Sequence, residues 1–353
     1  MQRLTIGILG AGGIARHHGQ GWRTHGDRAE VVAVADASAA RADAFAERFT
    51  DGRASHYADF HDLIADPNVE AVDVCLPHHL HAPAILAAAA AGKAILCEKP
   101  LCTSMADAAA IGAALDASGA TFVMAHNQLF QPSLIEARRL LAMGALGRVS
   151  YLRSIEASQQ RGPSTGEIPI GLAPGESPWA WRTDPARMGG GEVFDTGWHG
   201  TYRLLALAGE RPVSVSALLG RFLHHGMTAE DSGSLTVRFE SGAIGEVVTS
   251  WAFGLPGDRQ FEVAGDLASL AGSPTETFFQ PHGWHDPQAL RHDPVLTFTA
   301  EIGHFLDVVQ RGAANLAPFA QGARTMQTIT AAYLAAEQER TVTIPEDPLT
   351  APV

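Results

Sequence analysis

Lys99 stands in the sequence Glu98-Lys99-Pro100, directly after the apolar residues 94–97. Of the 25 basic side chains of the chain, only Lys93 and Lys99 are lysines, and the others are arginines. Lysine changes its pKa readily, whereas arginine keeps its proton, so a lysine retained here predicts a role in proton transfer or charge stabilisation. A general preference for arginine is the simpler alternative, since Lys93 shows no task in the sequence.

Asp195 and His199 form a second pair of residues that could take part in catalysis. They are four residues apart, so in a helix that runs on from Phe194 they would share one face. A carboxylate in that position can orient an imidazole and raise its pKa. An exposed ion pair on a helix surface is the alternative.

A glycine-rich turn follows the first apolar segment. Residues 4–9 predict a strand, and Gly10, Gly12, Gly13, Ile14 and Ala15 form a G-x-G-x-x-A sequence that opens a helix. In a dinucleotide fold such a turn lets pyrophosphate approach the helix N-terminus. A second strand, residues 31–35, ends at Asp36, where an acid binds both ribose hydroxyls of NAD and repels the 2′-phosphate of NADP. NAD is therefore the predicted cofactor.

Further strands are expected at residues 71–76, 94–97 and 121–125, with helices at 82–91 and 106–117 between them. This alternation predicts a parallel sheet whose ligands bind beyond the carboxyl ends of the strands. Two segments fall at such ends, residues 77–81 and 98–100.

The composition bounds the class of protein. A chain of 353 residues predicts two domains, and a net charge of -13 argues against nucleic acid and membrane surfaces as partners. Three cysteines, an odd number in apolar segments, favour a reducing cytoplasm over a disulfide framework. Residues 1–9 lack the pattern of a signal peptide, and the longest apolar run, 82–92, is too short to span a bilayer.

In the order of its motifs, the whole chain resembles the glucose-fructose oxidoreductase, inositol dehydrogenase and MocA (Gfo/Idh/MocA) family. The resemblance rests on the glycine turn, on Pro77 and His81, on Glu98-Lys99-Pro100-Leu101, on Trp181-Arg182, on Gly189 to Gly191 and on Asp195-Thr196-Gly197-Trp198-His199. It implies an α/β fold with a Rossmann domain at residues 1–126 and, at 127–353, a substrate and oligomerisation domain with an open, mostly antiparallel sheet. A homodimer or homotetramer is implied too.

The resemblance also implies site residues. The catalytic residues would be Lys99, Asp195 and His199, with Pro77, His81, Glu98, Lys99, Trp181 and Arg182 near the cofactor, in addition to the glycine turn and Asp36. Asn127 and Tyr202 would lie near the substrate, with Lys99, Asp195 and His199. At both places the sequence departs from the family: Asn127-Gln128-Leu129 lacks an expected arginine, and Tyr202 replaces an aspartate. A cis bond before Pro100 is implied as well.

The polar loop 158–178, followed by Trp179 and Trp181, predicts a pocket wall or lid, with disorder as the alternative. Residues 278–285 mix aromatics with histidines, which suits either a sugar or an oligomer contact. The 16 histidines lack the Cys or Glu spacing typical of zinc centres, so no metal is expected.

The expected function is an NAD-dependent enzyme that oxidises a secondary hydroxyl of a sugar, a sugar derivative or a cyclic polyol. His199 would take the hydroxyl proton and Lys99 would stabilise the developing alkoxide, with Lys99 as the base being the alternative. Two alternatives remain open. One is a redox-neutral lyase, epimerase or glycosidase that recycles its NAD, and the other is a non-catalytic NAD-binding regulator.

Overall fold

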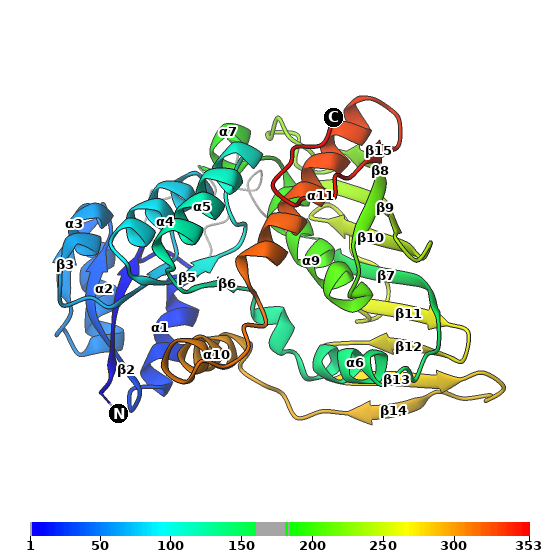
Figure 1. The fold of residues 1–353 in the computed structure, drawn as a ribbon, viewed down its shortest axis with the longest axis horizontal. Helices are drawn as coiled ribbons and strands as arrows, with labels where there is room; N and C mark the ends of the chain where they lie inside the picture. Colours follow the sequence, from blue (N-terminus) through cyan, green and yellow to red (C-terminus); the bar gives the residue numbers. More distant parts are fainter. Residues whose placement is uncertain (1, 160–180, 183) are drawn as a thin grey trace. The chain divides into compact units, whose positions relative to one another are not determined.

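The computed structural model describes residues 2–159, 181, 182 and 184–353, which form two compact units (Figure 1). The first unit holds the described residues up to Asn127, Trp181 and the segment Leu296–Gly322. The second holds residues 128–159, Arg182, the described residues from 184 to Val295, and Ala323–Val353. The sequence predicted one domain boundary after residue 126 and did not indicate that residues 296–322 belong to the first unit. The predicted division into residues 1–126 and 127–353 stays a prediction.

The first unit is built on a six-stranded sheet in the order β3-β2-β1-β4-β5-β6, in which every pair of neighbours is parallel. This is the strand order of the Rossmann fold, and it confirms the predicted fold class. Its strands are β1 (Leu4–Leu9), β2 (Ala29–Ala35), β3 (Ser55–Tyr57), β4 (Ala71–Val74), β5 (Ala94–Glu98) and β6 (Phe122–Ala125).

Helices alternate with these strands, as the apolar periodicity of the sequence requires. They are α1 (Ala15–Thr24), α2 (Ala39–Thr50), α3 (Phe60–Ala65), α4 (His81–Ala90) and α5 (Met105–Ser118), with a 3-10 turn η1 (His78–Leu80) before α4 and another, η2 (Asn127–Phe130), after β6. The predicted helices near 82–91 and 106–117 correspond to α4 and α5. Ser104 and Ser38 cap α5 and α2 through their side chains.

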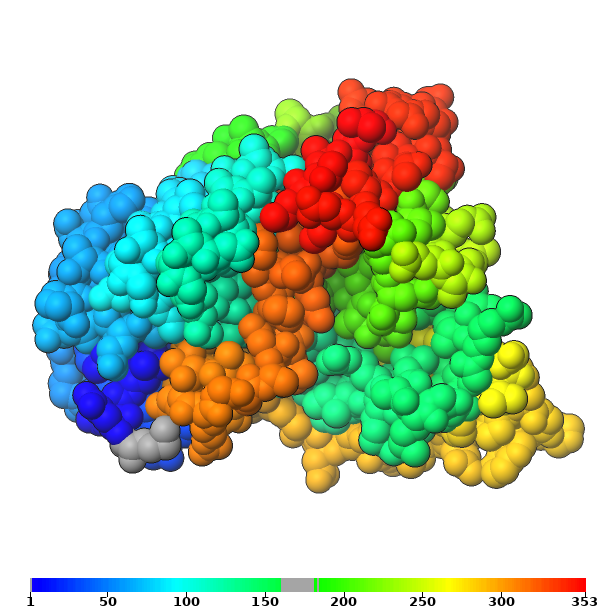
Figure 2. Space-filling view, viewed as in Figure 1, coloured from blue at the N-terminus to red at the C-terminus, as the bar shows by residue number. Residues whose placement is uncertain are grey.

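Helix α10 (Thr297–Arg311), from late in the chain, packs along α1 in the first unit. Figure 1 shows the two helices side by side, and Figure 2 shows the orange late segment against the dark blue start of the chain. The contact is close because Gly21 has no side chain, and a Cβ there would lie 2.4 Å from Cδ1 of Ile302. The rings of Trp22 and Phe305 meet edge to face with centroids 6.0 Å apart, so apolar packing holds the late segment in place.

The second unit is built on a nine-stranded sheet in the order β14-β13-β12-β11-β7-β10-β9-β8-β15, in which only β7 and β10 run parallel. The predicted open, mostly antiparallel sheet is thereby confirmed. The strands are β7 (Val149–Ala157), β8 (Pro212–Gly220), β9 (Ser232–Phe239), β10 (Ile244–Ser250), β11 (Phe261–Gly265), β12 (Ala268–Gly272), β13 (Glu276–Pro281), β14 (Gln288–Arg291) and β15 (Val342–Thr343).

Helices α6 (Pro132–Ala142), α8 (Glu192–Asp195) and α9 (Gly197–Ala208) pack on this sheet, α9 against β7 and β10. The short α7 (Pro185–Met188) precedes α8, and α11 (Phe319–Glu337) enters the second unit at Ala323. Along β9, Leu235, Val237 and Phe239 are buried while the residues between them are exposed, which is the alternation predicted for a half-buried strand. Among the described residues, no helix is both long and apolar enough to cross a membrane.

Candidate functional site

The glycine turn joins β1 to α1 at the carboxyl end of the sheet. Gly10 has φ +91°, and a Cβ there would lie 2.7 Å from the carbonyl oxygen of Cys75, so the fold itself requires glycine. Gly12 and Gly13 have open space where a Cβ would stand. Helix α1 begins after Ile14 without a side-chain cap. An uncapped helix start beside open backbone fits the pyrophosphate of a dinucleotide.

Asp36 directly follows β2 and is fixed by several donors. Its Oδ2 accepts the Ala11 backbone N–H at 2.9 Å, and its Oδ1 accepts the Ser38 backbone N–H at 2.8 Å. The guanidinium of Arg41 donates to the same Oδ1 through Nη2 at 2.7 Å and Nε at 3.1 Å. The carboxylate is therefore tied to the glycine turn, as ribose binding requires. The sequence showed no sign of a positive charge beside Asp36, because Arg41 lies five residues after Asp36, inside α2.

Lys99 follows β5 in a turn with a cis peptide bond between Lys99 and Pro100, as the family resemblance predicted. The Lys99 backbone N–H donates to Oε2 of Glu98 at 2.9 Å. Behind the turn, the buried ring of His81 lies 2.7 Å from the carbonyl oxygen of Pro100 and 2.8 Å from that of Leu76. Burial lowers the pKa of His81. This ring thus ties the carboxyl ends of β4 and β5 together.

The structure gives Lys93 a task that the sequence did not show. Its side chain is buried, and Nζ donates to the carbonyl oxygen of Asp66 at 2.8 Å and to that of Val69. Burial lowers its pKa. Lys93 therefore has a structural role: it satisfies backbone carbonyl oxygens between α3 and β4.

Three more predicted site residues lie in the first unit. Pro77 precedes η1, whose His78 ring meets the Trp181 ring at a centroid distance of 4.6 Å. Asn127 opens η2 and donates from Nδ2 to Oγ1 of Thr297 at 3.0 Å. Trp179 and most of the loop predicted at 158–178 lie outside the described residues.

Arg182, Asp195, His199 and Tyr202 lie in the second unit. Nε of Arg182 donates to Oδ2 of the buried Asp195 at 3.0 Å. The helix predicted to run on from Phe194 is interrupted at Thr196, between α8 and α9, where Oγ1 accepts the Trp251 indole N–H at 2.6 Å. His199 follows in the first turn of α9. Tyr202, in the same helix, is only 2 % exposed.

The arginine missing after Asn127 has a counterpart in α9. Arg203 is fully buried, and its guanidinium donates to Oε1 of Gln128 at 2.8 Å, to Oγ of Ser154 at 3.0 Å and to Oε2 of Glu156 at 3.0 Å. A buried guanidinium from α9 thus lies beside Gln128, the position at which the family resemblance implied an arginine.

Gly189, Gly190 and Gly191 pack against side chains of the second unit. A Cβ on Gly190 would lie 2.4 Å from the Tyr333 hydroxyl, and one on Gly191 would lie 2.3 Å from the Glu230 carbonyl oxygen. The Tyr333 hydroxyl accepts the Gly191 N–H at 3.0 Å and donates to Glu230 Oε1 at 2.6 Å. The structure explains these glycines by contacts within the protein.

Gly191→Ala is expected to destabilise the protein by about 1–3 kcal/mol, because the added methyl group has no space. Gly226→Ala is the matched control: that position is exposed, has no heavy atom within 4 Å of the added Cβ, and is expected to change stability by less than about 0.5 kcal/mol. Urea unfolding of both variants measures the difference. Equal stabilities of the two variants would contradict the packing role.

Two buried carboxyl groups flank this glycine segment. Oε1 of Glu192 accepts the Thr249 hydroxyl, while burial raises the pKa of Glu192 well above its usual range. Burial also raises the pKa of Glu230, although the Tyr333 hydroxyl and backbone N–H groups oppose it. The pKa of each group is therefore higher in the folded chain than in the unfolded chain, where a glutamate loses its proton above about pH 4.3.

The free energy of unfolding is therefore expected to fall as the pH rises above about 4.3, by up to about 1.4 kcal/mol per pH unit for each carboxyl group that stays protonated only in the folded state. Histidines with a lowered pKa, such as His81 and His304, act in the opposite direction up to about pH 6.5, above which they have lost their protons in both states. Urea unfolding at several pH values measures the slope. Glu192→Gln should make it shallower, and an unchanged slope would show that Glu192 is ionised.

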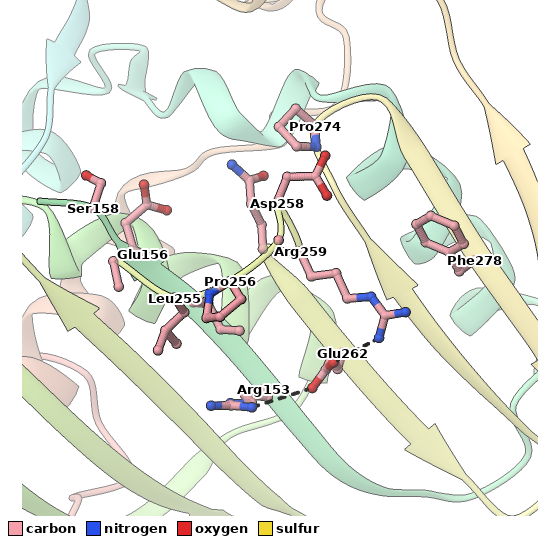
Figure 3. Close-up of a pocket in the computed structure, with 14 residues that line it drawn as sticks. Arg153, Glu156, Ser158, Leu255, Pro256, Asp258, Arg259, Glu262, Pro274 and Phe278 are labelled. Carbon is pink, nitrogen blue, oxygen red and sulfur yellow. Dashed lines mark hydrogen bonds and ion pairs between the residues drawn. The ribbon is translucent and has the colours of Figure 1, made fainter. Parts of the chain in front are cut away.

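A depression of about 700 Å³ lies on the sheet of the second unit, beside β7 and β11 (Figure 3). Its charged side chains pair with one another: Oε atoms of Glu262 lie 3.8 Å from Arg153 and 3.4 Å from Arg259. The Arg259 guanidinium also lies 5.5 Å from the ring centre of Phe278. Phe278, one of the residues 278–285 that the sequence suggested for a sugar site or an oligomer contact, lines this depression.

Two groups of buried side chains in the first unit have metal-ligand chemistry, His18 with Asp73 and Cys75, and His18 with Glu98 and Glu301. The His18 ring, however, is hydrogen-bonded at both nitrogens, at 2.9 Å and 3.0 Å to Oδ atoms of Asp73 and at 3.0 Å to Oε1 of Glu98. Such contacts are those of a protonated imidazole, whereas a metal ligand needs one nitrogen without its proton.

Comparison with known proteins gives the family. A sequence profile described as "Oxidoreductase family, NAD-binding Rossmann fold" matches residues 4–126, and the profile of the GFO/IDH/MocA C-terminal domain matches residues 134–271. The chain belongs to the Gfo/Idh/MocA family. The predicted family, its NAD-binding fold and its oxidoreductase class are thereby confirmed.

Among Gfo/Idh/MocA relatives, levoglucosan dehydrogenase of Pseudarthrobacter phenanthrenivorans is 27 % identical over 76 % of this chain and 73 % of its own length. Inositol 2-dehydrogenase of Acidothermus cellulolyticus is 39 % identical, over 41 % of this chain and 42 % of its own length. The crystal structure of an aldose-aldose oxidoreductase from Caulobacter crescentus, complexed with glycerol, is 25 % identical and covers 97 % of this chain and 100 % of its own, with a TM-score of 0.83.

A structure of levoglucosan dehydrogenase with NADH and levoglucosan has a TM-score of 0.87 over 98 % of this chain and 100 % of its own, at 23 % identity, and shares the Gfo/Idh/MocA fold.

Proposed function

We propose that this protein is an NAD-dependent dehydrogenase that oxidises a secondary hydroxyl group of a sugar, a sugar derivative or a cyclic polyol. The observation that carries the proposal is Lys99, placed one residue beyond β5 in a unit whose glycine turn and Asp36 fit NAD. Relatives named for levoglucosan, inositol and 1,5-anhydro-D-fructose support the substrate class, because all three compounds carry ring hydroxyl groups.

The groups that fit NAD are Asp36 for the ribose hydroxyls, the backbone at Gly12 and Gly13, and the start of α1 for the pyrophosphate. Bound NAD supplies the hydride acceptor. Pro77, His81, Glu98, Trp181 and Arg182 are proposed to lie near it. In the proposed reaction His199 takes the hydroxyl proton, and the Lys99 ammonium stabilises the oxygen as negative charge develops.

Asp195 is proposed to hold His199 in the tautomer that can accept the hydroxyl proton. Its ion pair with Arg182 fixes one carboxylate oxygen, and both residues belong to the proposed site. Asn127 is proposed to contact substrate from the first unit. Tyr202, 2 % exposed, is also proposed to lie near the substrate.

Purified protein incubated with NAD and a panel of monosaccharides, inositols and anhydrosugars tests the proposal. NADH should accumulate, followed by its absorbance, with at least one member of the panel. Turnover of a sugar without accumulated NADH would instead show a redox-neutral enzyme that recycles its cofactor. NAD binding without turnover across the panel would favour a regulator.

Two further properties, the cellular compartment and the oligomeric state, are proposed from exposed and buried side chains. The three cysteines are all buried and none forms a disulfide, which supports a reducing compartment, and we propose the cytoplasm. We also propose a homodimer or homotetramer. Leu218 of β8 and Ile244 of β10 are 80 % and 41 % exposed, which supports a covered sheet in the assembly. Light scattering gives the number of subunits, and a monomer would refute this part.

A further inference from the structure

The buried ring of His18 in α1 lies between carboxylates from two strands. Nδ1 is 3.0 Å and 2.9 Å from the two oxygens of Asp73 in β4, and Nε2 is 3.0 Å from Oε1 of Glu98 in β5. His18 and Asp73 are fully buried, and Glu98 is 6 % exposed. A neutral imidazole carries one N–H and could donate to only one of these groups. Two carboxylates, one at each nitrogen, therefore indicate an imidazolium.

Both carboxylates have the contacts of ionised groups. Besides the His18 ring, Asp73 accepts the Trp22 indole N–H at 2.7 Å, and the Cys75 thiol lies 3.6 Å from its other oxygen. Each oxygen of Glu98 accepts a donor, because Oε2 receives the backbone N–H of Lys99 at 2.9 Å. An unbroken series of hydrogen bonds thus runs from Asp73 through His18 and Glu98 to the backbone of Lys99.

Glu301 of α10 is the third carboxyl group beside the ring. Its Oε1 is 3.7 Å from Nε2 of His18, and neither of its oxygens has a hydrogen-bond partner among the described residues. Burial raises the pKa of Glu301 well above its usual range, with Glu98 and Asp73 adding to the effect of burial and His18 opposing it. A second negative charge against Glu98 would be costly in this buried place, so the fold favours the protonated form of Glu301.

The charges around His18 come from every element that packs on it. Asp73 and Cys75 face the ring from β4, Glu98 from β5 and Glu301 from α10, while His17 and Arg16 neighbour it on α1. Burial pushes the pKa of His18 down, but the Asp73 carboxylate, through its charge and its hydrogen bonds, outweighs burial and holds the pKa well above its usual value. The ring therefore keeps its charge across the physiological pH range.

We propose that His18 is a positioning residue for the dehydrogenase reaction: its imidazolium, held by Asp73, fixes the Glu98 carboxylate that holds the Lys99 backbone N–H. The inference rests on the proposed function of Lys99. A fixed turn matters because a displacement of about 1 Å in a group near the reacting atoms costs about 100-fold in rate. His18 acts through Glu98 and makes no contact with substrate in this proposal.

Two substitutions separate the two nitrogens of the ring. The amide of His18→Gln can occupy the position of Nε2 and still donate to Glu98, whereas that of His18→Asn reaches only the position of Nδ1, toward Asp73. At saturating NAD and substrate, His18→Asn should lower kcat by about 100-fold and His18→Gln by less than about 10-fold. The KM for substrate should change little in both. His17→Gln, the same substitution at the exposed neighbouring histidine, is the matched control and should leave kcat unchanged.

Two measurements remain valid whether or not a substrate is found. Nitrogen-15 NMR of the imidazole rings, with His18→Gln assigning the signal, should show an imidazolium for His18 from about pH 6 to pH 9, beyond the usual histidine range. Amide hydrogen exchange at Lys99 should be faster in His18→Asn than in wild type and close to wild type in His18→Gln. Failure of the proposed function alone would leave both results intact.

Several outcomes would overturn the inference. A neutral His18 ring at neutral pH, or equal losses of kcat and of amide protection in the Gln and Asn variants, would show a packing role only. A divalent metal bound in one-to-one ratio and lost in both variants would show that the ring is a ligand. Glu301→Gln should leave the His18 NMR signal of an imidazolium in place, because it replaces one neutral group by another.

Discussion

Lys99→Met is expected to lower kcat by about 100-fold to 10,000-fold, while NAD binding changes little. Methionine keeps the length and apolar stem of the side chain but carries no charge and no proton. The ammonium acts mainly as charge develops on the substrate oxygen, so its loss should appear in kcat more than in KM. Steady-state kinetics with the best substrate of the panel, together with NADH fluorescence titration, measure both quantities.

Lys93→Met is the matched control, because the chain offers this single other lysine. Its ammonium satisfies the carbonyl oxygens of Asp66 and Val69, so the variant should lose stability by about 1–3 kcal/mol and keep kcat. His199→Ala should lose kcat as Lys99→Met does. Near-full turnover of Lys99→Met or His199→Ala would remove that residue from the chemistry, whereas loss of kcat in Lys93→Met would show that the assay reports folding.

Asp36→Ser should reverse the preference between the two cofactors, with kcat/KM for NADP relative to NAD rising by about 100-fold or more. Removing the carboxylate removes the charge that repels a 2′-phosphate. It also releases the guanidinium of Arg41, which is held at 2.7 Å from Oδ1 in the present protein. An arginine next to a phosphate forms strong, paired hydrogen bonds.

The double variant Asp36→Ser with Arg41→Ala separates these two effects. It should bind NAD as weakly as the single variant but lose most of the gained NADP activity, since serine alone offers no positive charge. The ratio of kcat/KM values for the two cofactors decides the matter. An NADP preference that survives the loss of Arg41 would assign phosphate recognition to another residue.

Local sequence patterns were sufficient for the parallel sheet and for the nucleotide turn. Six-residue apolar runs, the spacing of Gly10, Gly12 and Ala15, and an acid at the end of the second strand all act over short distances, and β1, α1 and Asp36 lie where those patterns predict. The cis bond at Lys99 and the arrangement of the strands in the second sheet followed only from the family resemblance.

What the sequence did not reveal depends on contacts between distant residues. Arg41 neutralises Asp36 from inside a helix, and Arg203 reaches Gln128 from 75 positions further along the chain. The glycines before α8 are required by Tyr333 and Glu230, which lie far from them in sequence. In the same way His18 meets Asp73, Glu98 and Glu301 only after folding. A pattern of residue types could signal Arg41, one helical turn past the cap at Ser38, but not the others.

The order in which the chain is synthesised gives the late helix α10 a further significance. Its residues 297–311 pack on α1 and bring Glu301 to His18, so the nucleotide-binding unit lacks a structural component until the ribosome has reached residue 311. Domains usually mature in the order of translation. Here the amino-terminal part must wait, with Trp22 uncovered, for a segment translated almost three hundred residues afterwards. A nascent chain stalled before α10 should accordingly resist proteolysis less than one released after it.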